Sequence, residues 1–252
     1  MKISNVLVSQ PKPAAESNNP YQLLADKLKF NVEFRQFIKV EGVTSKEFRG
    51  QHINLPDFTA VVFTSKIGID NYFKFAKEIK FNVPEDMLYF CTTEAIALYL
   101  QKYIIFRKRK IFYGTKTISD ITDTIKKHLD AKVLIVKGDV SNDEIPKFFD
   151  KMKMFHKEIT LYKTVSADLS DIEKDFSKYQ VLVFFTPSGI RSLKENFPDW
   201  KQGDVKIAAF GATTHEEIKK LGYTLDIAAP TEENPSMIMA LEKFITAANK
   251  KK

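Results

Sequence analysis

Short apolar segments alternate with helix-like segments along this chain of 252 residues, and this alternation narrows the possible folds more than any other feature. The runs Phe58–Thr64 and Gln180–Thr186 are mainly apolar, which is typical of central strands in a parallel sheet. Strands that alternate with helices of about ten residues predict parallel sheets with right-handed crossovers. Further strands are expected at 5–10, 87–91, 132–136, 205–210 and 224–229, an extended segment at 104–112, helices at 17–29, 117–128, 143–151, 170–177, 213–221 and 236–247, and helices that begin near 65, 92 and 187. The sequence therefore predicts an α/β fold.

Two runs that alternate between the faces of a strand, Val32–Val40 and Glu158–Val165, lie far apart in the sequence. In the second run, Tyr162 shares one face with two threonines. We expect the two runs to pair and to join two lobes, because a chain of this length suits two domains as well as one. The expected division is residues 1–32 plus 167–252 as a discontinuous first α/β domain, 43–155 as the second, and 33–42 with 156–166 as paired linker strands.

The cysteine and histidine content argues against several kinds of site. Cys91 is the only cysteine, so no internal disulfide and no cysteine-based metal set is possible. The four histidines lack the spacing of a metal site. The glycine-rich signatures of dinucleotide and P-loop sites are missing, as is the Gly-x-Ser-x-Gly elbow of hydrolases. We therefore expect no metal site, no dinucleotide site and no P-loop.

Charge and hydropathy bear on partners and location. The net charge of +7 is spread along the chain, with one dense run at Arg107–Lys110 that is typical of a solvated face, so we expect no nucleic-acid partner. The balance suits an acidic small molecule. The N-terminus lacks the apolar run of a signal peptide, and no stretch approaches the ~20 apolar residues of a membrane span. We expect a cytoplasmic protein without a membrane partner, and a monomer because no coiled coil is evident.

The two halves of the chain contain similar segments. Val61–Gly68 aligns with Val183–Ile190, and Phe90–Ile96 aligns with Phe210–Glu216. Each is a strand that runs into a turn rich in threonine or serine and then into a helix. Ligands bind at the carboxyl ends of parallel strands, and helix N-termini attract anions. Such hydroxyl residues are also common helix caps. For each of these hydroxyl residues, ligand binding and helix capping both stay open. The recurrence of the same turn in both lobes favours ligand binding.

Seven short segments, in this order and spacing, resemble the uroporphyrinogen-III synthase family over nearly the whole chain. They are Leu7–Pro11, Val62–Ser65, Val136–Asp139, Leu161–Val165, Phe185–Ile190, Ala209–Thr214 and Ala229–Thr231. The resemblance implies two flavodoxin-like parallel-sheet domains joined by a two-stranded β-ladder. It also implies a cofactor-free lyase that closes the linear tetrapyrrole hydroxymethylbilane, a polycarboxylate, into uroporphyrinogen III, with loss of water and inversion of the last ring.

The resemblance assigns roles to residues in both lobes. Tyr162 matches the family's strand tyrosine, which is thought to help the hydroxyl group leave; a phenol stays protonated at neutral pH and can donate to a departing oxygen. Alternatively, Tyr162 packs at the domain junction with its hydroxyl bonded to backbone. The implied substrate-binding residues are Thr64, Ser65, Lys66, Lys137, Gly138, Thr186, Ser188, Gly189, Thr213, Thr214 and Thr231.

Two positions depart from the family pattern. Glu94 stands where a threonine is usual, and a carboxylate is a poor neighbour for a polyanion although it suits the start of a helix. Lys137 stands where arginine is frequent, which weakens bidentate carboxylate binding. Two alternatives therefore accompany the enzyme: a non-enzymatic two-lobed protein that binds or senses a small anion, and a member of the family fold that has lost the activity.

Overall fold

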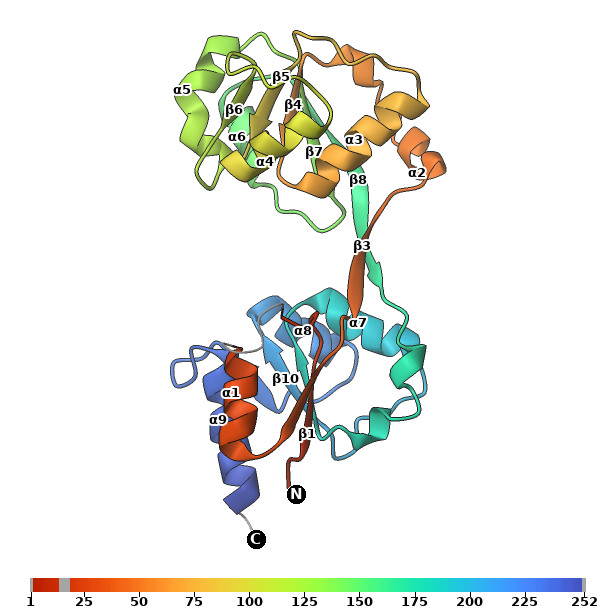
Figure 1. Cartoon of the computed structure of the whole chain (residues 1–252), viewed down its shortest axis with the longest axis vertical. Helices are drawn as coiled ribbons and strands as arrows, with labels where there is room; N and C mark the ends of the chain where they lie inside the picture. Colours follow the sequence, from red (N-terminus) through yellow and green to blue (C-terminus); the bar gives the residue numbers. More distant parts are fainter. Residues whose placement is uncertain (1, 14–18, 251–252) are drawn as a thin grey trace. The chain divides into compact units, whose positions relative to one another are not determined.

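The computed structural model describes residues 2–13 and 19–250, and the chain divides into two compact units. The first unit combines Met1–Lys39 with Val165–Lys252, and the second is the continuous segment Val40–Thr164. Figure 1 shows a sheet flanked by helices in each unit. Both sheets contain parallel strands joined through helices, which confirms the predicted α/β class.

The sheet of the first unit has the strand order β11-β10-β9-β1-β2, and every pairing in it is parallel. Alternate residues of its strands enter different cores. Val6 and Val8 pack with α1 and α9, whereas Leu7 and Leu182 pack with α7 and α8. The elements are β1 Asn5–Val8, α1 Pro20–Leu28, β2 Asn31–Phe34, β9 Val181–Phe184, α7 Pro187–Asn196, β10 Lys206–Phe210, α8 Ala212–Lys220, β11 Ile227–Ala229 and α9 Met237–Lys250, with 3₁₀ turns at Ser170–Ile172 and Phe176–Lys178.

The sheet of the second unit has the order β3-β8-β7-β4-β5-β6, and its pairings from β8 to β6 are parallel. Val61 and Val136 face the core under α3 and α4, whereas Val62 and Ile135 face the other core. Cys91 ends β5 and is fully buried in the first of these cores. The elements are β3 Ile38–Gly42, α2 Ser45–Gly50, β4 Ala60–Phe63, α3 Lys66–Glu78, β5 Leu88–Cys91, α4 Glu94–Tyr99, β6 Ile111–Tyr113, α5 Thr122–Ile125, β7 Val133–Gly138, α6 Glu144–Lys151 and β8 His156–Ser166, with 3₁₀ turns at Leu55–Asp57, Leu100–Lys102, Ile118–Ile121 and Lys126–His128.

Strands β3 and β8 are neighbours at the edge of the second sheet. The Val43 N–H donates to Leu161 O at 3.1 Å and the Ala167 N–H donates to Phe37 O at 2.9 Å, so the two segments run antiparallel. Strand β8 also pairs along its first half with β7. It is therefore an internal strand of the second sheet as well as a connection.

Four predicted elements differ in the structure. The helix predicted at 117–128 is a 3₁₀ turn, the four-residue helix α5 and a second 3₁₀ turn. The run Val32–Val40 is not one strand, because β2 ends at Phe34 and β3 begins at Ile38. Of the extended segment 104–112, only its end belongs to a strand, β6. The helix predicted at 170–177 is two 3₁₀ turns. Among the described residues, no helix combines the length and apolar character needed to cross a membrane.

Candidate functional site

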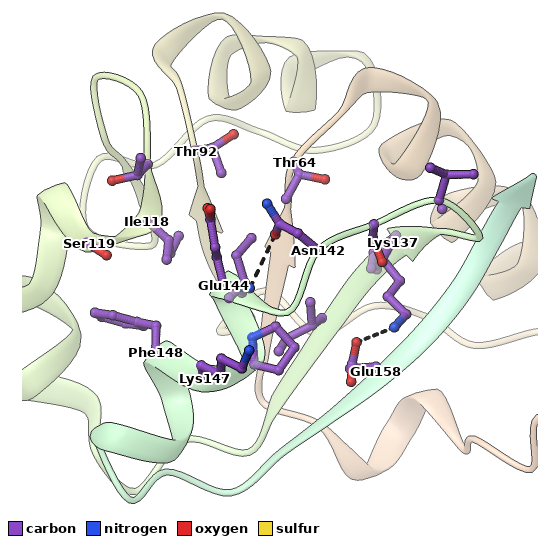
Figure 2. Close-up of a pocket in the computed structure, with 18 of the residues that line it drawn as sticks. Thr64, Thr92, Ile118, Ser119, Lys137, Asn142, Glu144, Lys147, Phe148 and Glu158 are labelled. Carbon is purple, nitrogen blue, oxygen red and sulfur yellow. Dashed lines mark hydrogen bonds and ion pairs between the residues drawn. The ribbon is translucent and has the colours of Figure 1, made fainter. Parts of the chain in front are cut away.

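A cavity of about 680 Å³ opens at the carboxyl edge of the second sheet (Figure 2). Its walls come from the ends of β4, β5 and β7, from β8, from helix α6 and from the loop that follows β6. Residues that line it include Thr64, Thr92, Lys116, Thr117, Ile118, Ser119, Ile135, Lys137, Gly138, Asn142, Glu144, Ile145, Lys147, Phe148, Lys151, Glu158 and Tyr162. The carboxyl edge of a parallel sheet is where α/β proteins bind ligands.

Strand register brings the polar residues of this edge together. Phe63 pairs with Cys91 on one side and with Val136 on the other, so the residues that directly follow these three lie side by side. Two of them are Thr64 and Lys137, which the sequence predicts as binding residues, and the third is Thr92.

Tyr162 lies at this edge with its ring packed between two glycines. A β-carbon on Gly138 would lie 2.5 Å from Tyr162 Cε2, and one on Gly68 would lie 3.5 Å from Tyr162 Cε1. The register of β7 and β8 shifts at Lys137 and Gly138, and Gly138 then pairs with Tyr162. Only a residue without a side chain fits beneath the ring at position 138.

The Tyr162 hydroxyl is bonded to a side chain. Ser65 Oγ and Tyr162 Oη are hydrogen-bonded at 3.0 Å, and the Gly68 N–H donates to Ser65 Oγ at 3.1 Å. Ser65 is thus the N-cap of α3 and the partner of the tyrosine at once. Among the described residues, Tyr162 Oη has Ser65 as its hydrogen-bond partner, so the interpretation with a hydroxyl bonded to backbone is wrong.

Cations and apolar side chains share the lining. Lys116 and Lys151 have no ion pair within the described part of the chain, and Lys147 lies a distant 3.8 Å from Asp143. Lys137 is engaged, since its Nζ lies 2.5 Å from Glu158 Oε2 (Figure 2). Apolar lining comes from Ile118, Ile135, Ile145 and Phe148. This combination suits a flat apolar group that carries carboxylates.

Asp120 fixes the loop that presents Lys116. Its carboxylate accepts hydrogen bonds from the backbone N–H groups of Lys116, Thr117 and Thr115, at 2.9 to 3.1 Å. These backbone hydrogen bonds, together with the Thr115 hydroxyl, hold the pKa of Asp120 well below its ordinary value. The loop backbone is therefore ordered by an ionised carboxylate, while the Lys116 ammonium stays available.

Three of the residues singled out in the second unit are absent from the cavity lining: Ser65, which is bonded to Tyr162, and two that lie elsewhere. Lys66 is exposed, with its Nζ 5.3 Å from the centre of the Tyr99 ring, and is not part of the cavity lining. Glu94 starts α4, accepts a hydrogen bond from the Tyr113 hydroxyl at 3.1 Å, and is likewise absent from the lining.

The predicted residues of the first unit follow the ends of its strands. Thr186 caps α7, where it accepts the Gly189 N–H at 3.2 Å, and Ser188 accepts a hydrogen bond from Arg191 at 3.1 Å. In the first turn of α8, Thr213 is exposed and Thr214 is buried. Thr231 follows β11, and its Oγ1 accepts the Asn234 N–H at 3.0 Å. These residues thus gather at the carboxyl edge of the first sheet.

Several lining residues escape sequence reasoning. Thr92 directly follows β5 and could have been found by its position after a predicted strand. Lys147 and Lys151 are four residues apart on α6, a spacing that places both on one helix face. Lys116 gives no such signal, because its loop reaches the cavity only through folding. Across residues 2–13 and 19–250, no group of three or more metal-ligating side chains is present.

Comparisons with known proteins give consistent results. The model of the family described as Uroporphyrinogen-III synthase HemD matches residues 20–239. Uroporphyrinogen-III synthase of Chlorobaculum parvum is 30% identical over 118 residues, which cover 44% of this chain and 48% of that protein. Uroporphyrinogen-III synthase of Saccharomyces cerevisiae is 22% identical over 139 residues, which cover 50% of each. The chain thus spans about half the length of these two relatives.

A solved structure extends the likeness to the fold of the whole chain. Uroporphyrinogen-III synthetase from Helicobacter pylori superimposes with a TM-score of 0.51, at 15% identity, over 97% of this chain and 100% of that one. At this identity the likeness concerns the fold alone.

Proposed function

Because the chain belongs to the uroporphyrinogen-III synthase family, we propose that it converts hydroxymethylbilane into uroporphyrinogen III, as a carbon–oxygen lyase without a cofactor. The observation that carries this proposal is the Tyr162 hydroxyl, held by Ser65 beside a cavity with three lysines that have no close ion pair among the described residues. The cavity supplies a proton donor and cations, which are the two groups that ionisation of a polyanionic alcohol requires.

In the proposed reaction, Tyr162 donates its proton to the oxygen of the hydroxymethyl group. The carbon–oxygen bond breaks, water leaves, and the terminal ring becomes an azafulvene cation. The far ring attacks this carbon through its substituted α-carbon to form a spiro intermediate, which reopens and closes with that ring inverted. The final closure releases a proton, which restores the phenol.

The substrate carries an acetate and a propionate on every pyrrole ring, so its binding depends on cations. We propose that Lys116, Lys147 and Lys151 bind carboxylates of a ring that packs against Phe148. We also propose that the substrate's other carboxylates are bound by residues at the carboxyl edge of the first sheet, namely Thr186, Ser188, Thr213 and Thr231.

The test is to incubate the purified chain with enzymatically made hydroxymethylbilane and to separate the uroporphyrin I and III isomers. The type III isomer is expected, because spontaneous closure gives type I. Tyr162→Phe is expected to lower kcat on the order of 10²-fold without abolishing turnover, since orientation of the rings supplies much of the rate.

Tyr113→Phe is the matched control, because Tyr113 is 39% exposed and is bonded to Glu94 outside the cavity lining. It should keep the wild-type kcat. Type I isomer alone from the wild-type chain contradicts the proposed function.

A protein that binds the linear tetrapyrrole without closing it is the second candidate. The lining supports it, because Lys116, Lys147, Lys151 and the apolar side chains would bind the polyanion whether or not Tyr162 donates a proton. A rise in melting temperature with hydroxymethylbilane, and type I isomer as the sole product, would identify this function.

A further inference from the structure

We propose that Ser65 is a positioning residue that turns the hydroxyl proton of Tyr162 away from α3 and so leaves it free for donation. The inference rests on the proposed function and adds a residue that acts through the tyrosine. Its basis is the pair of hydrogen bonds at Ser65 Oγ, which lies 3.0 Å from Tyr162 Oη and accepts the Gly68 N–H at 3.1 Å.

A hydroxyl group has one proton and two lone pairs. The two hydroxyl oxygens lie 3.0 Å apart, and either can donate to the other. In the proposed arrangement the Ser65 proton points at Tyr162 Oη, so the tyrosine presents a lone pair to Ser65 and its own proton lies elsewhere. The positive end of α3 favours this arrangement, since α3 spans Lys66–Glu78 and its first turn attracts an acceptor atom and repels a proton.

The position of the Tyr162 ring limits the directions in which its hydroxyl proton can point. Gly138 packs closely against one side of the ring, and a β-carbon on Gly68 would lie at an ordinary contact distance of 3.5 Å from the other side, so the ring is held beside Ser65. The remaining freedom is rotation of the phenolic proton, which prefers the ring plane and points either toward Ser65 or away from it. Donation by Ser65 selects the second orientation, and Tyr162 lines the cavity.

The test is a set of Ser65 variants assayed for conversion of hydroxymethylbilane, alone and combined with Tyr162→Phe. Ser65→Ala removes the hydrogen-bond donor, and we expect kcat to fall roughly tenfold with KM nearly unchanged. This loss is one part of the ~10²-fold rate enhancement that a general acid provides. Ser65→Thr keeps both hydrogen bonds and should restore kcat. Ser65→Asp still caps α3 but has no proton to give, so it should lower kcat at least as much as Ser65→Ala.

In the Tyr162→Phe background, Ser65→Ala should have no further effect on kcat, because the group it positions is gone. Thr44→Ala is the matched control for the lost cap, since Thr44 caps α2 by accepting the Glu47 N–H at 3.2 Å. It should lower the melting temperature and leave kcat unchanged.

The inference is overturned if Ser65→Ala keeps the wild-type kcat, or if it lowers kcat by the same factor with and without Tyr162. Ser65→Thr keeps the test valid should Ser65→Ala fail to fold, because a folded Ser65→Thr with tenfold lower kcat also overturns it. Failure of the proposed function looks different, since the wild-type chain then forms type I isomer alone, and the inference falls with it.

Discussion

At the scale of single residues, Gly138 is the tightest restraint at the site. A β-carbon there would lie 2.5 Å from one atom of the Tyr162 ring and 3.0 Å from another, which is closer than packed atoms tolerate. On the opposite side of the ring, a β-carbon on Gly68 would lie at an ordinary contact distance of 3.5 Å, so the tight contact is the one with Gly138. The ring and the bulge at Gly138 therefore fix each other.

Gly138→Ala is expected to lower the free energy of unfolding by about 1–3 kcal/mol, because the added methyl group overpacks this contact. It should also lower kcat, since Tyr162 is displaced. Urea unfolding followed by circular dichroism measures the first effect. Gly50→Ala is the control, because nothing lies within 4 Å of a β-carbon at this exposed helical position. Equal stability of the wild-type chain and Gly138→Ala would contradict the argument.

The sequence locates some residues of the cavity and misses others for a physical reason. Thr64, Lys137 and Gly138 directly follow predicted strands, and strand ends of a parallel sheet share one edge. Lys116 and Lys147 lie on a loop and a helix whose approach to that edge depends on tertiary packing. No local pattern encodes that approach.

At the scale of elements, α2 is fastened to β8 through Glu47. The Glu47 carboxylate accepts hydrogen bonds from Lys163 Nζ at 2.6 Å and from the Thr44 N–H at 2.7 Å, which completes a capping box. The hydrogen bond from Lys163 and those from Thr44 lower the pKa of Glu47 to about 2 from the model-peptide value of 4.5. Lys163 stays cationic across the acid range, because its own pKa is raised by the same partner.

This lowered pKa predicts how stability responds to acid. A carboxylate with a lower pKa in the folded state stabilises the fold above its unfolded pKa and loses that contribution as pH falls through the folded pKa. The difference in free energy of unfolding between the wild-type chain and Glu47→Gln should therefore be largest above pH 4.5 and shrink toward pH 2. Urea unfolding at a series of pH values measures it. A difference that is constant over this range contradicts the assignment.

The run Val32–Val40 illustrates what element prediction lacks. Its alternation is interrupted at Gln36 and Phe37; Phe37 is buried in the core of the first unit, and its carbonyl accepts a hydrogen bond from Ser192. The chain leaves one sheet at Phe34 and enters the other at Ile38. An alternating pattern predicts that one face of a strand is buried, and it does not indicate which sheet the strand joins.

At the scale of the whole molecule, each buried core belongs to one unit. The two cores of the second unit run from Val43 to Leu161, and those of the first unit use residues before Val40 and after Thr164. We propose that these units are the two domains of the protein and that the second is an insertion in the first.

The fragment of residues 40–164 is therefore expected to fold alone, because it contains both of its cores and a continuous chain. A single cooperative urea transition, followed by circular dichroism, is the expected result. The fragment of residues 165–252 is the control and should stay unfolded, because it lacks β1, which lies between β9 and β2 in the first sheet. A gradual, non-cooperative change in the 40–164 fragment contradicts this division.

The buried thiol at the end of β5 gives the molecule an internal probe. Cys91 is the only cysteine of the chain, is fully buried in the second unit, and has its pKa raised by burial to about 12. An alkylating reagent can modify it only after the core around β5 opens. The rate of alkylation in the intact protein thus reports on opening of the second unit, with no engineered label and no contribution from the first.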